Sequence, residues 1–122
     1  MKNLFRQLIL WAGCAVCSYA QVPFDCNGRS FRVIKHGEGT YLQEMQRQGE
    51  KGKLTFNNLH YFPQTEINAI AYHPSQHVIY GILQEKPLKL CRIDAAFQLE
   101  VLQPLPLPEE LSFVSGDISP DQ

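Results

Sequence analysis

Short apolar runs separated by turn-forming residues dominate the chain from residue 30 onward, and this pattern predicts β-strands. The first run, Phe31-Arg32-Val33-Ile34, is closed by His36-Gly37-Glu38-Gly39. Residues 41–46 form the next candidate strand, which ends at the turn-rich residues 48–52. Leu54-Thr55-Phe56 then alternates apolar and polar side chains, as a half-buried strand does.

The second half of the chain contains two candidate hairpins. Residues 67–72 and 77–83 flank the turn His73-Pro74-Ser75-Gln76, and residues 88–93 and 98–102 flank Asp94-Ala95-Ala96. Helical periodicity is scarce, because the best stretch, residues 41–49, is rich in Gln and Glu and is cut short by glycines. Short strands at a spacing of about eight to twelve residues predict an all-β fold, either a sandwich, a barrel or a propeller.

An internal repeat separates these three architectures. Residues 69–76 match residues 115–122 at an offset of 46, with Pro74 and Pro120 at equivalent turns. Leu54-Thr55-Phe56 and Leu99-Glu100-Val101 match at an offset of 45. A period of about 40–50 residues that carries about four strands is typical of a propeller blade. We therefore predict about two four-stranded blades, whose core contains Ile70, Tyr72, Ile79, Ile82, Leu90 and Ile93.

The expected blades do not complete a propeller. Propellers close with about four to eight blades, and about three repeats are usually needed for stability. Residues 21–122 hold little more than two units of this period. We expect them to be a partial propeller-like domain, truncated at the C-terminus, whose partners are the remaining blades or downstream domains of the same protein. The alternative is a free-standing small β protein, such as a sandwich.

The first twenty residues predict a secretory signal peptide. Lys2 and Arg6 precede an apolar run over residues 8–16, and the small residues Ser18 and Ala20 precede Gln21. We expect cleavage between Ala20 and Gln21, and secretion or display at the cell surface. The run is shorter than the ~20 apolar residues that span a membrane. Lipidation is an alternative, because Ala12-Gly13-Cys14 resembles the end of a bacterial lipobox, although Trp11 stands where Leu is usual.

Two cysteines, Cys26 and Cys91, follow the expected cleavage point. An even number of cysteines in an exported chain permits one disulfide bond. The alternative is that each cysteine is a small buried apolar residue. The alternating run over residues 88–93 favours that alternative for Cys91.

Composition and charge exclude some functions without specifying one. The 122 residues carry a formal net charge of −1, which excludes a broadly basic protein that coats nucleic acid. His73 and His77 stand four residues apart, but Pro74 between them favours a turn over a zinc-binding helix face. The acidic residues form no paired-carboxylate pattern, and the serines lack a Gly-x-Ser-x-Gly setting. We therefore assign no catalytic, cofactor-binding or metal-binding residue.

Aromatic residues are the remaining candidates for ligand binding. The side chains that could stack on a sugar ring are Tyr61, Phe62, Tyr72 and Tyr80. Aromatic residues in β repeats usually belong to the core, so we favour a core role for these four.

Five segments resemble a propeller-like domain of unknown function that occurs near the N-terminus of large secreted bacterial adhesin-like proteins. The resemblance covers nearly all of residues 21–122, and it rests on residues 24–34, 67–74, 79–82, 90–94 and 116–121. The chain departs from that domain's pattern where Gln122 replaces the glycine of Ser-Pro-Asp-Gly, and where Cys91 replaces an aromatic or aliphatic residue. The resemblance implies a propeller fold and brings no catalytic residues.

The expected function follows from export and from the β repeats. We expect a non-catalytic structural or interaction module of a secreted or cell-surface bacterial protein, which contacts a surface protein or a glycan. The alternative is a fragment of a propeller enzyme, of the lyase or hydrolase type, whose active-site blades lie elsewhere. We expect no nucleic-acid partner and no membrane span.

Overall fold

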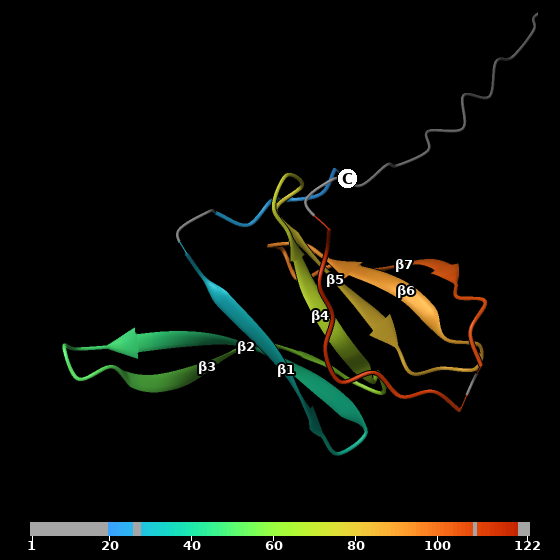
Figure 1. Cartoon of the computed structure of the whole chain (residues 1–122), viewed down its shortest axis with the longest axis horizontal. Helices are drawn as coiled ribbons and strands as arrows, with labels where there is room; N and C mark the ends of the chain where they lie inside the picture. Colours follow the sequence, from blue (N-terminus) through green and yellow to red (C-terminus); the bar gives the residue numbers. More distant parts are fainter. Residues whose placement is uncertain (1–19, 26–27, 109, 120–122) are drawn as a thin grey trace, which may run out of the picture.

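The computed structural model describes residues 20–25, 28–108 and 110–119, and these residues form two antiparallel β-sheets and no helix (Figure 1). Each sheet is a meander in chain order, so that every strand pairs with its neighbour in the sequence. The all-β prediction is therefore confirmed. The first sheet contains β1 (Ser30–His36), β2 (Gly39–Gln48) and β3 (Lys53–Phe62), and the second contains β4 (Ile67–His73), β5 (Val78–Leu83), β6 (Lys89–Ile93) and β7 (Leu99–Pro104).

Glycines with left-handed backbone angles form the hairpins of the first sheet. Gly37 has a φ of 57° in the turn between β1 and β2. Gly49 and Gly52, with φ values of 69° and 66°, lie in the turn between β2 and β3, where the Gly52 N–H donates to the Gly49 carbonyl at 3.1 Å. Glycine has no Cβ and adopts these angles at little steric cost. The two turns lie where the sequence predicts them.

Hydrogen bonds close the hairpins of the second sheet. The His77 N–H donates to the His73 carbonyl at 2.9 Å, which closes the predicted turn around Pro74. In the turn between β6 and β7, the Asp94 carboxylate accepts from the N–H groups of Ala96 and Gln98, both at 3.0 Å. Asp94 is only 5% exposed, so this carboxylate belongs to the interior of the turn.

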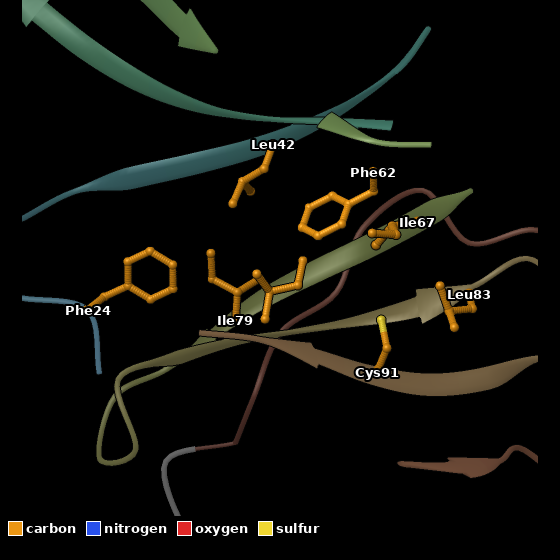
Figure 2. Packing of buried hydrophobic residues seen from close by; sticks show 8 residues of the cluster. Phe24, Leu42, Phe62, Ile67, Ile79, Leu83 and Cys91 are labelled. Carbon is orange, nitrogen blue, oxygen red and sulfur yellow. The ribbon is translucent and has the colours of Figure 1, made fainter. Parts of the chain in front are cut away.

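The core lies between the two sheets (Figure 2). Leu42 and Phe62 of the first sheet face the side chains of the second sheet, and Phe24 from the N-terminal segment closes one side. Burial of these apolar side chains is the main contribution that holds the sheets together, because no backbone ladder joins them. The members contributed by the second sheet are Ile67, Ile79, Leu83, Cys91 and Ile93.

A buried hydroxyl connects the sheets where the chain passes from one to the other. Thr40 in β2 is 1% exposed. Its hydroxyl donates to the carbonyl of Thr65 at 2.7 Å and accepts from the N–H of Ile67 at 3.2 Å. Both polar backbone groups are thereby satisfied without water, as buried groups require.

The side chains expected to form the blade core divide between two faces of the second sheet. Ile79 and Ile93 are 1% and 0% exposed in the core between the sheets, and Ile70 and Tyr72 pack partly buried against it. Ile82 and Leu90 are cross-strand partners on the opposite face. The first sheet has three strands among the described residues, whereas the sequence analysis expects four.

Several predictions concern residues outside the described part of the chain. Residues 1–19 of the expected signal peptide (residues 1–20), including Cys14, lie there, and so do Cys26 and Pro120. Cys91 is a free cysteine and fully buried, as the alternative interpretation of Cys91 expects, and the possible bridge to Cys26 is not tested because Cys26 lies outside the described residues. Pro74 is exposed in the turn between β4 and β5. Within the described residues, no helix is long and apolar enough to cross a membrane.

Candidate functional site

A hollow of about 500 Å³ lies on the face of the second sheet that points away from the first sheet. We call this face the second outer face and define it by Ala69, Ala71, His73, Tyr80, Ile82 and Leu90. Residues 115–118 form the opposite wall of the hollow. It is therefore enclosed by the sheet on one side and by an extended segment on the other.

Strand alternation and a β-bulge produce the apolar floor of the hollow. Ala71 pairs with Tyr80, and Ile82 pairs with Leu90, so these side chains lie on one face. The register between β4 and β5 shifts between Asn68 and Ala71, and Ala69 within this bulge has a φ of 50°. An extra residue in one strand re-aims side chains. Ala69 and Ala71 both line the hollow, and their short side chains leave the space that the hollow occupies.

The segment over residues 110–119 covers this face without joining either sheet (Figure 1). A Cβ atom added to Gly116 would lie 2.4 Å from the carbonyl oxygen of Ala69, so only glycine fits this approach to β4. Asp117 accepts a hydrogen bond from the N–H of Ile118 at 2.8 Å, and Ile118 is half-buried in the wall of the hollow. The segment is thus seated against the sheet at a defined place.

The polar groups near the hollow are engaged with the turn between β4 and β5. His73 is 8% exposed, and its Nδ1 lies 3.2 Å from both the backbone nitrogen of Gln76 and the hydroxyl of Ser75. The Tyr80 hydroxyl donates to the side-chain oxygen of Gln76 at 2.5 Å. Because these groups hold the turn, the hollow offers a mainly apolar floor to an occupant.

The two histidines of this turn make separate contacts. His77 Nδ1 lies 2.8 Å from the hydroxyl of Tyr72, whereas His73 faces Ser75 and Gln76. Across residues 20–25, 28–108 and 110–119, no three His, Cys, Asp or Glu side chains are grouped to hold a metal ion.

A second surface rich in apolar and aromatic side chains lies on the first sheet, on the side away from the core. We call it the first outer face and define it by Ile34, Tyr41, Tyr61, Met45, Phe56 and Leu54. The rings of Tyr41 and Tyr61 contact each other at a tilt of 44° with centroids 4.7 Å apart, and the Arg32 guanidinium lies 3.4 Å from the ring centroid of Phe56. On the same surface, the side-chain amide of Gln43 donates a hydrogen bond to the side-chain oxygen of Asn58 at 2.6 Å.

A β-bulge determines which side chains reach the first outer face. The register between β2 and β3 shifts between Leu42 and Gln43. This shift reverses the alternation along β3, so that Phe62 is buried while Leu54 and Phe56 are 54% and 39% exposed. The sequence analysis did not single out this surface. The sequence does contain further apolar residues on these strands, such as Leu54 and Phe56, but the bulge determines which face of the sheet they occupy.

Arginine–carboxylate pairs lie on the core side of the first sheet and on the second outer face. Arg29 donates to Glu44 at 2.6 Å, and this hydrogen bond is the main cause that raises the pKa of the guanidinium. Arg92 donates to Glu100 at 2.8 Å, which likewise raises the pKa of Arg92. These pairs keep both arginines charged and fixed across neighbouring strands.

The aromatic residues weighed as a sugar platform have different surroundings. Phe62 is a core residue and Tyr72 packs against the core. Tyr80 lines the hollow, and Tyr61 lies on the first outer face. The structure therefore does not bring these four rings together on one surface.

No known family, curated protein or solved structure matches this chain. The resemblance to a secreted propeller-like domain accordingly remains a prediction. The established result is an all-β chain of two antiparallel sheets, with three and four strands among the described residues.

Proposed function

We propose that this chain is an exported, non-catalytic structural or interaction module whose two sheets act as blades of a propeller. The observation that carries the proposal is the second outer face, which is apolar, is hollowed by about 500 Å³ and is covered by a single extended segment. A sheet that is apolar on both faces is stabilised by a neighbour on each side. In this proposal the hollow is the place of the next blade.

The packing of the two sheets supports this proposal. Both sheets are antiparallel meanders, and they pack face to face through the core residues Leu42, Phe62 and Ile79. Both also carry a further apolar surface on the side away from the core. This arrangement suits units that stack around an axis, since each unit buries both faces against its neighbours.

One of the two matched pairs of sequence segments occupies equivalent positions, and the members of the other pair lie side by side. The pair matched at an offset of 45 lies in β3 and in β7, each the last strand of its sheet. Of the pair matched at an offset of 46, the first member covers β4 and its turn. The described part of the second member, residues 115–119, lies beside β4 and meets it at Gly116.

The export part of the proposal is tested at the N-terminus. The chain would be expressed from Met1 in a bacterium, and the product in the medium and at the cell surface would be sequenced from its first residue. Export with cleavage gives Gln21 as that residue. Recovery of the chain only inside the cell with Met1 intact would reject export.

The interaction part is tested by photo-crosslinking in the producing cell. A benzoylphenylalanine replaces Tyr80 on the second outer face, and a matched variant carries it at Val101, a 50% exposed residue on the opposite face of β7. The proposal expects one partner, joined at a defined peptide that mass spectrometry identifies, from position 80 and not from position 101. Equal labelling at both positions, or none at either, would reject an interaction role for this face.

A further inference from the structure

The first sheet lacks one strand that the second sheet has. In the second sheet, β4 precedes β5 and forms the edge of the meander. In the first sheet, β1 is the corresponding edge, and no described strand pairs with its free side. An edge strand presents unpaired N–H and C=O groups that can pair with another strand.

The offset between the two sheets identifies the missing strand. Because Leu54 in β3 matches Leu99 in β7, the order of strands equates β2 with β6 and β1 with β5. This leaves β4 without a counterpart in the first sheet. The position that is empty beside β1 is therefore that of a β4-type strand.

The chain also carries a β4-type strand that belongs to no sheet. The offset of 46 equates β4 with residues 113–119. Residues 113–118 are extended, lie outside both sheets and approach β4 closely at Gly116. Val114 in this segment is 93% exposed, which leaves one side of the segment open to pairing.

We propose that residues 113–118 of one copy of this chain pair with β1 of a second copy, and thereby complete a four-stranded sheet shared between the copies. The inference rests on the proposed function, because it assumes that the sheets stack as blades. It specifies the partner: a second copy, which contributes a strand by the addition of main-chain hydrogen bonds to a sheet edge.

The apolar surfaces fit the same arrangement. When β1 of the second copy pairs with residues 113–118, its sheet stands against the second outer face of the first copy. Its first outer face, with Ile34 and Tyr41, then covers Ile82 and Leu90. Both surfaces that are open in a single copy are buried in this contact, including the hollow.

The contact joins two different surfaces, so it is head-to-tail and generates a ring or an open chain of copies. Each copy contributes two sheets, and propellers close with about four to eight blades. A closed ring would accordingly contain about two to four copies. The second copy is the chosen occupant because this chain carries the donor strand, the acceptor edge and both apolar surfaces.

The first experiment measures the mass of the full chain in solution. The chain is purified after expression from Met1 and examined by sedimentation and native mass spectrometry over a range of concentrations. The expected result is a discrete assembly of about two to four copies. A monomer at every concentration would overturn the inference.

Complementary variants show which contact forms the assembly. Val114→Pro removes a backbone N–H from the donor segment, and Ile34→Lys places a charge on the acceptor sheet, at a residue that is 42% exposed. Each variant alone should weaken association at least about tenfold. Leu107→Lys, at an exposed residue outside both surfaces, serves as the control and should leave the mass unchanged.

Mixing the two defective variants gives the decisive result. The Ile34→Lys copy retains an intact donor strand and the Val114→Pro copy retains an intact acceptor edge. An equimolar mixture should therefore form one-to-one dimers at concentrations where either variant alone is mostly monomeric. Absence of these mixed dimers would contradict strand donation between copies.

The crosslinking result separates this inference from the proposed function. If the full chain is monomeric but position 80 captures a different polypeptide in the cell, the second copy is excluded and the module role stands. If position 80 captures no partner, both proposals fall. Crosslinked dimers of the purified chain from position 80, and not from position 101, would support both.

Discussion

At the scale of single residues, the Asp94 carboxylate connects three backbone N–H groups from two parts of the chain. Its carboxylate accepts from the N–H groups of Ala96 and Gln98 in its own turn. It also accepts from the N–H of Val22, 72 residues earlier in the chain, at 3.0 Å. One side chain therefore shapes the turn between β6 and β7 and fixes the N-terminal segment to it.

Replacing Asp94 tests this role. Asp94→Ala leaves three N–H groups without their acceptor, so we expect the free energy of unfolding to fall by about 1–3 kcal/mol. Urea denaturation followed by circular dichroism measures the change. Asp117→Ala is the matched control, because Asp117 is exposed and its carboxylate accepts from the adjacent N–H of Ile118. Equal losses in the two variants would contradict the role of Asp94.

Cys91 makes stability depend on pH in the alkaline range. Burial raises the pKa of its thiol from 9.0 to about 12. Below pH 9 the thiol is protonated in both the folded and the unfolded chain, so it contributes no pH dependence. Between pH 9 and about 12 only the unfolded thiol releases its proton, which favours unfolding.

The comparison with a Cys91→Val variant isolates this effect. Relative to the variant, the native chain should lose stability as the pH rises above 9, by up to about 1.4 kcal/mol per pH unit. Denaturant midpoints measured between pH 7 and pH 11 report the difference, since tyrosine and lysine titrations are common to both proteins. Parallel curves over this range would show that the thiol does not titrate as expected.

At the scale of strands, the sequence predicts the positions of the strands better than their faces. Apolar runs and turn residues place all seven strands among the described residues. The faces depend on bulges in both sheets, and a bulge has no distinct residue pattern here. Leu54 and Phe56 alternate as side chains of a half-buried strand do, yet the bulge opposite Leu42 turns them outward.

Neighbouring residues of β5 should therefore respond differently to truncation. Leu83 is 1% exposed in the core, and Leu83→Ala should lower the free energy of unfolding by about 2–5 kcal/mol. Ile82 is only half-buried on the second outer face, so Ile82→Ala should cost clearly less in a monomeric preparation. Thermal melts of both variants at low protein concentration test the difference, and a larger loss for Ile82 would show that this face is already closed.

The close approach of Gly116 to β4 gives a further prediction at this scale. The added methyl group of Gly116→Ala meets the Ala69 carbonyl oxygen, so residues 113–118 should detach from the sheet. Because the segment is outside both sheets, the global melting temperature should change little. Limited proteolysis should cut within residues 110–119 faster than in the native chain. Ser115→Ala is the control, and equally fast cleavage of that variant would argue against a specific contact at Gly116.

The candidate site was only partly predictable from the sequence. The sequence predicts Ile82 and Leu90 as apolar and Tyr80 as aromatic residues of strands, and the second outer face consists of such residues. The hollow itself lies beside the bulge at Ala69 and is bounded by the segment that contacts β4 at Gly116. Neither feature follows from local periodicity, because each depends on how distant segments pack.

At the scale of the whole molecule, two separate hydrogen-bonded sheets share one core. No ladder crosses between them, so their cooperation depends on side chains such as Leu42 and Phe62 and on the Thr40 hydroxyl. The β1 and β4 strands lie close to each other where the sheets meet (Figure 1). Loss of a shared core residue should therefore weaken both sheets together.

Phe62→Ala tests the coupling of the sheets. Removing this 5% exposed ring should lower the free energy of unfolding by about 3–5 kcal/mol. Hydrogen exchange should show faster opening of amides in β5 and β6 as well as in β2 and β3. Exchange that accelerates in the first sheet alone would indicate two independently folding units.

The N-terminal segment has a consequence for the order of folding. The Phe24 N–H donates to the carbonyl of His77 at 2.8 Å, and the Val22 carbonyl accepts from Ala95 at 2.8 Å. The segment that is synthesised early thus binds to turns that are made much later, and it must wait until residue 95 has emerged. Contacts over such separations slow folding, because the intervening loop is closed before the contact forms. The earliest described residues are consequently among the last to reach their final positions.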